Sequence, residues 1–239
     1  MPTATPDQIR DSLVVVTASA AEDIQAVAAQ GDSPSSIRAL LFVAAPLVVR
    51  DYGDGAAALA RDWYDQLREA AKPGKGFTPQ PVFTVDEDGV ARSVAWATQP
   101  LYELGQSSEW TVDDLVKHAT DESMARLLPD MQKAVASGFR DTIVTNSNED
   151  PEVSGWRRYA RTGACKFCEM LADKGAIFTE ASVRFAAHGD CHCLAGPSFD
   201  PEAPKASVEQ YVASQRTRTN AESAHLRDYL NRYYPDSPG

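Results

Sequence analysis

All four cysteines of this 239-residue chain lie within one short stretch. Cys165 and Cys168 form a C-x2-C pair, and a second cluster follows one loop later, with His188, Cys191 and Cys193 close together. Two close-spaced groups of soft ligands are what a structural zinc site requires, because each group places two ligands on one tight turn. The pattern therefore predicts that this stretch folds back on itself and brings its two turns together around a metal ion.

The motif offers five candidate ligands for the four positions of a tetrahedral zinc site. The preferred set has x2 spacing in both halves and consists of Cys165, Cys168, His188 and Cys191. An all-cysteine set, in which Cys193 replaces His188, stays open. A closed site of either kind would contribute folding free energy and leave no coordination position for a substrate.

Two other interpretations of the cysteines stay open. One is a pair of disulfides, but the N-terminal residues lack the basic region and apolar core of a signal peptide, which predicts synthesis in a reducing cytosol. The other is catalysis, but neither a thioredoxin-like setting nor the residue order of a zinc deaminase is visible. His192, between two cysteines, is expected to point away from the metal. The chain also lacks the nucleophile-elbow, Walker A and dinucleotide-binding motifs, so we predict no enzymatic activity.

The net charge of −11 argues against a protein that coats nucleic acid, because phosphate binding needs a basic face. The cysteine region is a local exception, with six Lys or Arg against four acids between residues 155 and 195. Arg157, Arg158 and Arg161 are therefore either solvated side chains around a metal site or a patch for weak, non-specific DNA contact. No apolar stretch reaches the ~18–20 residues of a membrane span, so no membrane contact is expected.

Helical patterns dominate the first 150 residues. Capping signals at Thr5, Ser33 and Thr111 predict helix starts, and apolar residues follow the first two at helical spacing. A helix over about 88–97 is preferred to a short strand over 82–85.

Several residues are expected to interrupt these helices. Gly53 and Gly55 should end the second helix, with a third over 56–71, and Pro46 should kink or split the helix that contains it. After Thr111 we expect one short helix to His118 and another from Asp121 to Phe139 or beyond, which Pro129 could kink or split.

These patterns predict a mainly α fold in three parts. A helical domain (1–150) precedes a small zinc-stapled α+β module (151–199), and a linker with a long C-terminal helix follows (200–239). Inside the module we expect a helix over 165–174 and a short strand over 176–179. Residues 197–204 read as an extended linker, and 207–234 as the final helix.

The stretch from Trp156 to Cys193 resembles the phage minor head proteins related to protein F of phage Mu, in the form found in phages of actinobacteria. Proteins of this type end their signature with a His followed by C-x-C, and the actinobacterial ones add an upstream C-x-x-C. The resemblance supports five metal ligands by position, namely Cys165, Cys168, His188, Cys191 and Cys193. Arg157, Arg158 and Arg161 match the basic approach to the first cysteine, with no role assigned.

The resemblance implies a non-enzymatic minor capsid or head morphogenesis protein, made in the host cytoplasm and incorporated into the virion head. Its expected partners are the portal, scaffold or major capsid protein, and its expected action is in procapsid assembly or DNA packaging. A zinc-dependent nucleic-acid-binding phage regulator is the alternative, which the mildly basic cysteine region supports and the acidic remainder opposes.

Overall fold

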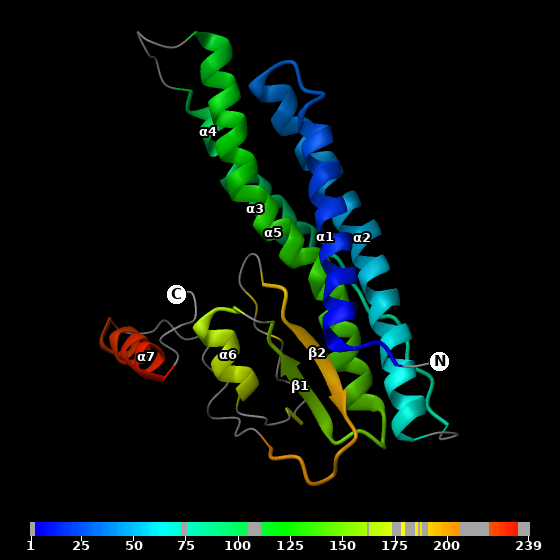
Figure 1. The fold of residues 1–239 in the computed structure, drawn as a ribbon. Coiled ribbons are helices and arrows are strands. Elements are labelled where there is room, and N and C mark those ends of the chain that lie inside the picture. Colours follow the sequence, from blue (N-terminus) through cyan, green and yellow to red (C-terminus); the bar gives the residue numbers. More distant parts are fainter. Residues whose placement is uncertain are drawn as a thin grey trace.

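Three long helices form an elongated bundle in the computed structural model: α1 (Pro6–Ala28), α2 (Pro34–Ala71) and α5 (Val112–Glu149) (Figure 1). Two shorter helices, α3 (Glu87–Ala97) and α4 (Gln99–Tyr102), pack on α2 and α5. The prediction of a mainly α fold is confirmed. The structure describes residues 3–72, 76–104, 111–161, 163–173, 178–179, 185, 187, 191–205 and 220–233.

The helix starts lie where the capping signals predicted them. Thr5, Ser33 and Thr111 are the N-caps of α1, α2 and α5, and each side chain accepts a hydrogen bond from the third backbone N–H of its helix. In each case the third residue also bonds back to the cap, which completes a capping box. These starts need only local hydrogen bonds, so a short sequence pattern is enough to predict them.

The expected break at Gly53 and Gly55 is wrong, because α2 runs uninterrupted to Ala71 and also passes through Pro46. The reason is tertiary. A Cβ on Gly53 would overlap the ring of Phe83, and a Cβ on Gly138 of α5 would lie only 2.3 Å from the carbonyl oxygen of Gly53. Gly53 therefore makes room for Phe83 and Gly138 lets the two long helices approach closely, and this packing outweighs the low helix propensity of glycine.

The expected pair of helices after Thr111 is also wrong, because α5 is one helix of 38 residues that includes Pro129. Ala119, between the two expected helices, and Ser123, in the first turn of the second one, are both buried. Leu127 and Met131 continue the same buried face. Continuous burial along one face holds the helix together where local signals suggested an interruption.

The segment before α3 is extended, but it is not the strand that was considered over 82–85. Its backbone bonds to side chains of α5 instead of to another strand. Asn146 accepts from the Gln80 amide at 2.8 Å and donates to the Gln80 carbonyl at 2.7 Å. Thr142 does the same for Val82, at 2.9 Å in both directions. The preferred helix over 88–97 is confirmed by α3.

Two strands form an antiparallel sheet beside the lower end of the bundle: β1 (Gly155–Tyr159) and β2 (Leu194–Ser198). Neither strand was predicted, and the expected linker from Pro197 is wrong at its first two residues, which belong to β2. Pro197 lies opposite Trp156, whose N–H and C=O both bond to Phe178 on the other side. A proline is tolerated there because Trp156 already has both of its backbone partners.

Helix α6 (Lys166–Asp173) confirms the helix expected over 165–174 and contacts β1. Helix α7 (Asn220–Tyr233) falls within the expected final helix and contacts α6, where Lys166 bonds to Asn231 at 2.7 Å. The rest of the expected final helix, residues 207–219 and Tyr234, lies outside the described residues. Of the expected strand over 176–179, only Phe178 and Thr179 are described.

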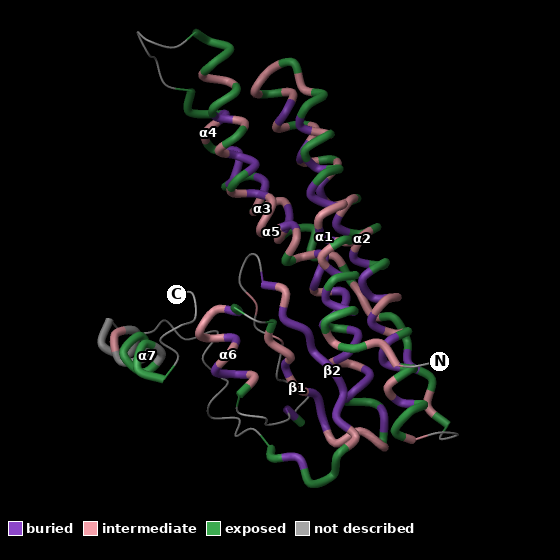
Figure 2. The backbone as a smooth tube through the Cα atoms, in the orientation of Figure 1, coloured by how far each residue is buried: buried purple, intermediate pink, exposed green. Residues whose placement is uncertain are grey.

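One hydrophobic core runs from the bundle into the sheet (Figure 2). Trp63 of α2 contacts Phe139 of α5 with ring centroids 5.9 Å apart, and Tyr159 of β1 at 6.1 Å. Trp156 and Leu194 belong to the same core. The domain boundary expected at residue 150 stays a prediction, although the helical bundle before it and the sheet after it share one core. No helix among the described residues has the length and apolar character to span a membrane.

Candidate metal centre

Three cysteines meet where α6, the residues before β2 and the side of α5 come together. Cys168 lies in the first turn of α6, and Cys191 and Cys193 immediately precede β2. Their sulfur atoms all lie within 4.8 Å of one another, and all three side chains are buried. The fold therefore brings the two halves of the sequence motif together, as the spacing predicted.

The separations fit a metal site better than a disulfide. The sulfurs of Cys168 and Cys191 are 3.8 Å apart, and all four cysteines are free thiols. A disulfide would need about 2.05 Å between the sulfurs. Two thiolates bound to one tetrahedral Zn²⁺ at about 2.3 Å would lie about 3.8 Å apart. The cluster can thus hold a tetrahedral metal ion with little movement of these two ligands.

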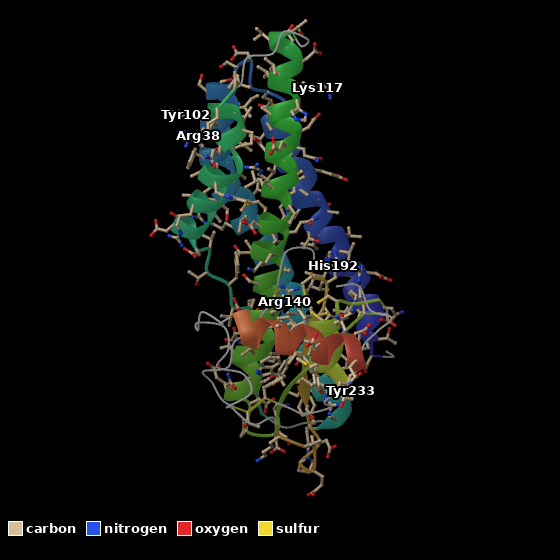
Figure 3. The ribbon with its side chains drawn as sticks, turned by 90° about the vertical axis from the view of Figure 1, so that its left-hand side faces the viewer. Arg38, Tyr102, Lys117, Arg140, His192 and Tyr233 are labelled. Carbon is tan, nitrogen blue, oxygen red and sulfur yellow. The ribbon has the colours of Figure 1, made fainter. Side chains whose placement is uncertain are left out.

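Arg140 of α5 anchors the C-x-C half of the cluster. Its Nε donates to the carbonyl oxygen of Cys193 at 3.2 Å, and its second terminal nitrogen donates to the carbonyl oxygen of Cys191. The side chain is only 2% exposed. Arg140 and His192, both labelled in Figure 3, lie near the junction of bundle and sheet.

Arg158 of β1 approaches the other half. One terminal nitrogen lies 3.5 Å from the sulfur of Cys168, and the side chain is 3% exposed. Phe185 lies against both arginines, with its ring centroid 4.9 Å from the guanidinium carbon of Arg140 and 3.7 Å from that of Arg158. Trp156 contacts the same ring at 5.8 Å. Two cations and an aromatic layer therefore cover the cysteines.

The cluster favours a thiolate at Cys191. Hydrogen bonds from Cys168 and Cys193, together with the positive charge of Arg140, hold the pKa of Cys191 well below its ordinary value. The pKa of Cys168 is raised, chiefly by its hydrogen bond to Cys191. Burial lowers the pKa of Arg140, but an arginine stays protonated in proteins. A thiolate is the form that binds a metal, so the site is electrostatically prepared for a cation.

The remaining predicted ligands are placed differently. Cys165 is half-buried immediately before α6 and packs against the cluster, but its sulfur is not within the group of three. His188 lies outside the described residues. His192 is half-buried, and its imidazole does not join the cluster.

The three arginines singled out in the sequence all line one hollow between β1 and α6, but they differ in burial and in partners. Arg158 faces the cysteines, whereas Arg157 is half-buried and donates to the Ser198 hydroxyl at 3.3 Å. Arg161 is exposed. This arrangement follows from strand geometry, because consecutive residues of β1 point to opposite sides of the sheet.

Sequence reasoning missed Arg140 and Phe185. Arg140 lies 28 positions before Cys168 and 51 before Cys191, so motif spacing could not connect them. One signal was present. Arg140 occupies the apolar face of its helix, between the buried residues Ala136 and Ile143. A charged side chain on a buried face requires a partner, which marks it as a candidate for a polar site.

The comparisons with known proteins give one match. The model of a protein family described as VG15 protein matches residues 1–215 of the chain, which include the bundle and the whole cysteine cluster. No curated protein and no solved structure matches the chain.

Proposed function

The chain belongs to the VG15 family, a family of phage proteins, and from this premise we propose that it is a minor component of the phage head whose cysteine cluster holds a structural Zn²⁺ ion. The observation that carries the metal part is the buried group of Cys168, Cys191 and Cys193. The head assignment is supported by the resemblance of the cysteine stretch to minor head proteins related to protein F of phage Mu.

Zinc fits this donor set better than a hard cation does. Three thiols and a buried, apolar surrounding favour a soft or borderline metal, whereas magnesium and calcium take oxygen ligands. The covering by Phe185 and two arginines leaves the cluster enclosed, which is typical of a structural rather than a catalytic site. The proposed role is therefore non-enzymatic: the ion would hold α6 and β2 against α5.

The bundle provides the surface for partners in the proposed role. Residues 1–150 carry 23 Asp or Glu against 12 Lys or Arg, so the entire net charge of −11 resides in this part of the chain. A long acidic rod attached to a zinc-stapled module suits a protein that contacts other head proteins, such as the portal, scaffold or major capsid protein. We propose that it acts in procapsid assembly or DNA packaging and remains in the virion after synthesis in the host cytoplasm.

A deletion of the gene in the phage tests this role. We expect lysates of the deletion to contain few infectious particles, and a plasmid copy of the wild-type gene to restore them. Purified heads should contain the protein in low copy, measured by quantitative mass spectrometry. Heads that assemble, package DNA and infect normally without the protein would refute the head role.

Metal analysis of the purified wild-type protein tests the zinc part separately. We expect close to one equivalent of zinc per chain by elemental mass spectrometry, and its loss in Cys168→Ser and Cys191→Ser. Ser147→Ala is the control, because it removes a buried hydroxyl of α5 that lies beside Tyr64 and is not one of the clustered ligands. A metal-free wild-type protein purified under reducing conditions would contradict the zinc site.

A zinc-dependent regulator that binds nucleic acid is the second candidate. Arg161 is exposed and Arg157 is half-buried, and both line a surface hollow between β1 and α6. A salt titration separates the two roles, because DNA affinity must fall steeply with salt if several phosphates are contacted. The burial of Arg158 leaves fewer cations for this purpose, so we expect weak binding at low salt and further loss in Arg161→Gln.

A further inference from the structure

We propose that Arg140 and Arg158 are the built-in counter-charges of the metal centre, and that they specify a four-thiolate set in which Cys165 is the fourth ligand. This inference rests on the proposed zinc site. It names the fourth ligand of the ion and the residues that balance the charge of the centre. It follows from the geometry of the two guanidinium groups, from their burial and from the charge that each ligand set would carry.

Each arginine contacts a different half of the ligand motif. Arg140 donates to the carbonyl oxygens of Cys191 and Cys193, which fixes the backbone of the C-x-C half. Arg158 donates to the sulfur of Cys168, which belongs to the C-x-x-C half. The two arginines come from α5 and β1, so the bundle and the sheet each orient one half-site. Such outer contacts are what hold metal ligands in position.

The charge balance distinguishes the two ligand sets. Four thiolates around Zn²⁺ carry a net charge of −2, whereas three thiolates and a neutral imidazole carry −1. The guanidinium groups of Arg140 and Arg158 add two positive charges to the same buried volume, with exposed fractions of 2% and 3%. Two guanidinium groups held against the cysteines attract a centre of charge −2 more strongly than one of charge −1, so their positions favour the four-thiolate set.

For Arg140 the described residues show no competing anion. Its hydrogen bonds go to the carbonyl oxygens of Cys193 and Cys191, which lie beside the thiols of the cluster. Two like charges are held near each other around Phe185, and an anionic centre beside them offsets their repulsion.

Cys165 is the cysteine in position to complete this set. It immediately precedes α6, its carbonyl oxygen accepts from the Glu169 amide at 3.0 Å, and its side chain packs against the other three cysteines. Cys165 and Cys168 are three residues apart, a spacing that lets both thiolates of a C-x-x-C pair bind one zinc ion.

Charge-removing variants of the full chain test the counter-charges. We expect Arg140→Gln and Arg158→Gln each to weaken zinc binding by about 10- to 100-fold, as for other residues that support metal ligands. Arg140→Lys should retain more affinity than Arg140→Gln because it keeps the charge while losing the forked hydrogen bonds. Competition with a chromophoric chelator measures the affinity of each variant.

The cobalt-substituted protein tests the ligand set. We expect Cys165→Ser to weaken the sulfur-to-cobalt charge-transfer absorption by about one quarter, because one of four thiolates is lost. His188→Ala should leave this absorption and the zinc affinity as in the wild type. The opposite result, loss with His188→Ala and none with Cys165→Ser, would overturn the four-thiolate set.

A stability control keeps these results interpretable. Leu127→Ala in α5 removes a fully buried side chain far along the helix from Arg140, so it lowers stability without touching the cluster. If Arg140→Gln and Arg158→Gln bind zinc as tightly as the wild type, or lose no more affinity than Leu127→Ala, the counter-charge role is refuted while the zinc site stands. A wild-type protein that binds neither zinc nor cobalt refutes the inference together with the zinc part of the proposed function.

Discussion

A buried polar network ties the ends of α2 and α5 together where the chain enters the sheet. Arg68 of α2 donates to the carboxylate of Asp150 at 2.7 Å, and both side chains are almost fully buried. The hydroxyl of Tyr64 lies 3.3 Å from the same carboxylate and 3.2 Å from the carbonyl oxygen of Asn146. Because a buried charge without its partner is strongly destabilising, removal of either member of the ion pair should cost about 3–5 kcal/mol.

Tyr64 gives this network a predictable dependence on pH. Burial, and next the charge of Asp150, raises the pKa of Tyr64 well above its ordinary value of 10.0. Above pH 10 the unfolded chain therefore loses a proton that the folded chain keeps, so the free energy of unfolding should fall as pH rises. Tyr64→Phe should make this alkaline decline shallower, as measured by urea unfolding between pH 8 and 11.

A variant that is less stable but keeps all its tyrosines provides the comparison. Leu127→Ala should lower the free energy of unfolding by about 2–5 kcal/mol at every pH and leave the alkaline decline as steep as in the wild type. An unchanged decline in Tyr64→Phe would show that this phenol ionises equally in both states.

At the scale of elements, the close approach of α2 and α5 depends on a glycine of α5. A Cβ on Gly138 would approach the backbone oxygen of Gly53 to 2.3 Å, whereas a Cβ on Gly53 itself would overlap the ring of Phe83. Gly55 lies only two residues from Gly53 in the same helix, but a Cβ there would meet nothing within 4 Å. The same residue type thus has opposite consequences at two neighbouring positions.

Alanine substitutions measure this difference. Gly138→Ala should destabilise the protein by about 1–3 kcal/mol, because the helices must separate to admit a methyl group. Gly55→Ala should stabilise it by about 0.5–1 kcal/mol, because alanine is the better helix former and no contact opposes it. Thermal and urea unfolding of the two variants test the pair, and a gain in stability from both would mean that the helices are not in close contact.

Helix α5 contacts the other helices of the bundle and both strands. Thr142 and Asn146 bond to the extended segment before α3, Phe139 contacts Trp63 of α2, and Arg140 reaches the cysteine loop. One helix of 38 residues thus positions both the bundle and the candidate metal centre. A split at Pro129, as the sequence suggested, would have left the contacts with the bundle and with the metal centre on two separate helices.

At the scale of the whole molecule, the metal centre lies to one side of a bundle that has its own extensive core. We expect removal of zinc by a chelator to increase hydrogen exchange in β1, β2 and α6. Helix α1 should keep its protection because it packs mainly on α2 and α5, besides a hydrogen bond from Arg10 to the Ala160 carbonyl oxygen. Hydrogen-exchange mass spectrometry of the full chain measures both regions. Cys193→Ser should reproduce the pattern without chelator.

The extent to which hydrogen-exchange protection is lost also tests how strongly the shared core couples the bundle to the cysteine module. Trp156 and Leu194 belong to the same core as the bundle, so some loosening should extend to the ends of α2 and α5 that contact the sheet. Equal loss of protection in α1 would mean that the bundle and the cysteine module unfold as one unit.

The sequence alone determined the local features of this protein. Capping boxes at Thr5, Ser33 and Thr111 depend on residues three apart, and the cysteine spacing depends on short turns, so both could be predicted without knowledge of the fold. The helical character of the first 150 residues was predicted from similarly local patterns and the phage origin from a family resemblance, and both are confirmed. The finer likeness to protein F of phage Mu stays a prediction.

Only the tertiary structure decided where helices continue, which strands pair and what surrounds the cysteines. Gly53 and Pro129 carry local signals for interruption, but the burial of a long face overrides them because packing free energy accumulates along the whole helix. The sequence around Pro197 is typical of a linker, and only the fold shows that this proline belongs to β2, opposite Trp156. In the sequence Arg140 is one helical arginine among several. Only the fold places it beside the loop of Cys191, which is 51 residues away along the chain. Contacts between distant segments follow from shape and burial, which no spacing in the sequence records.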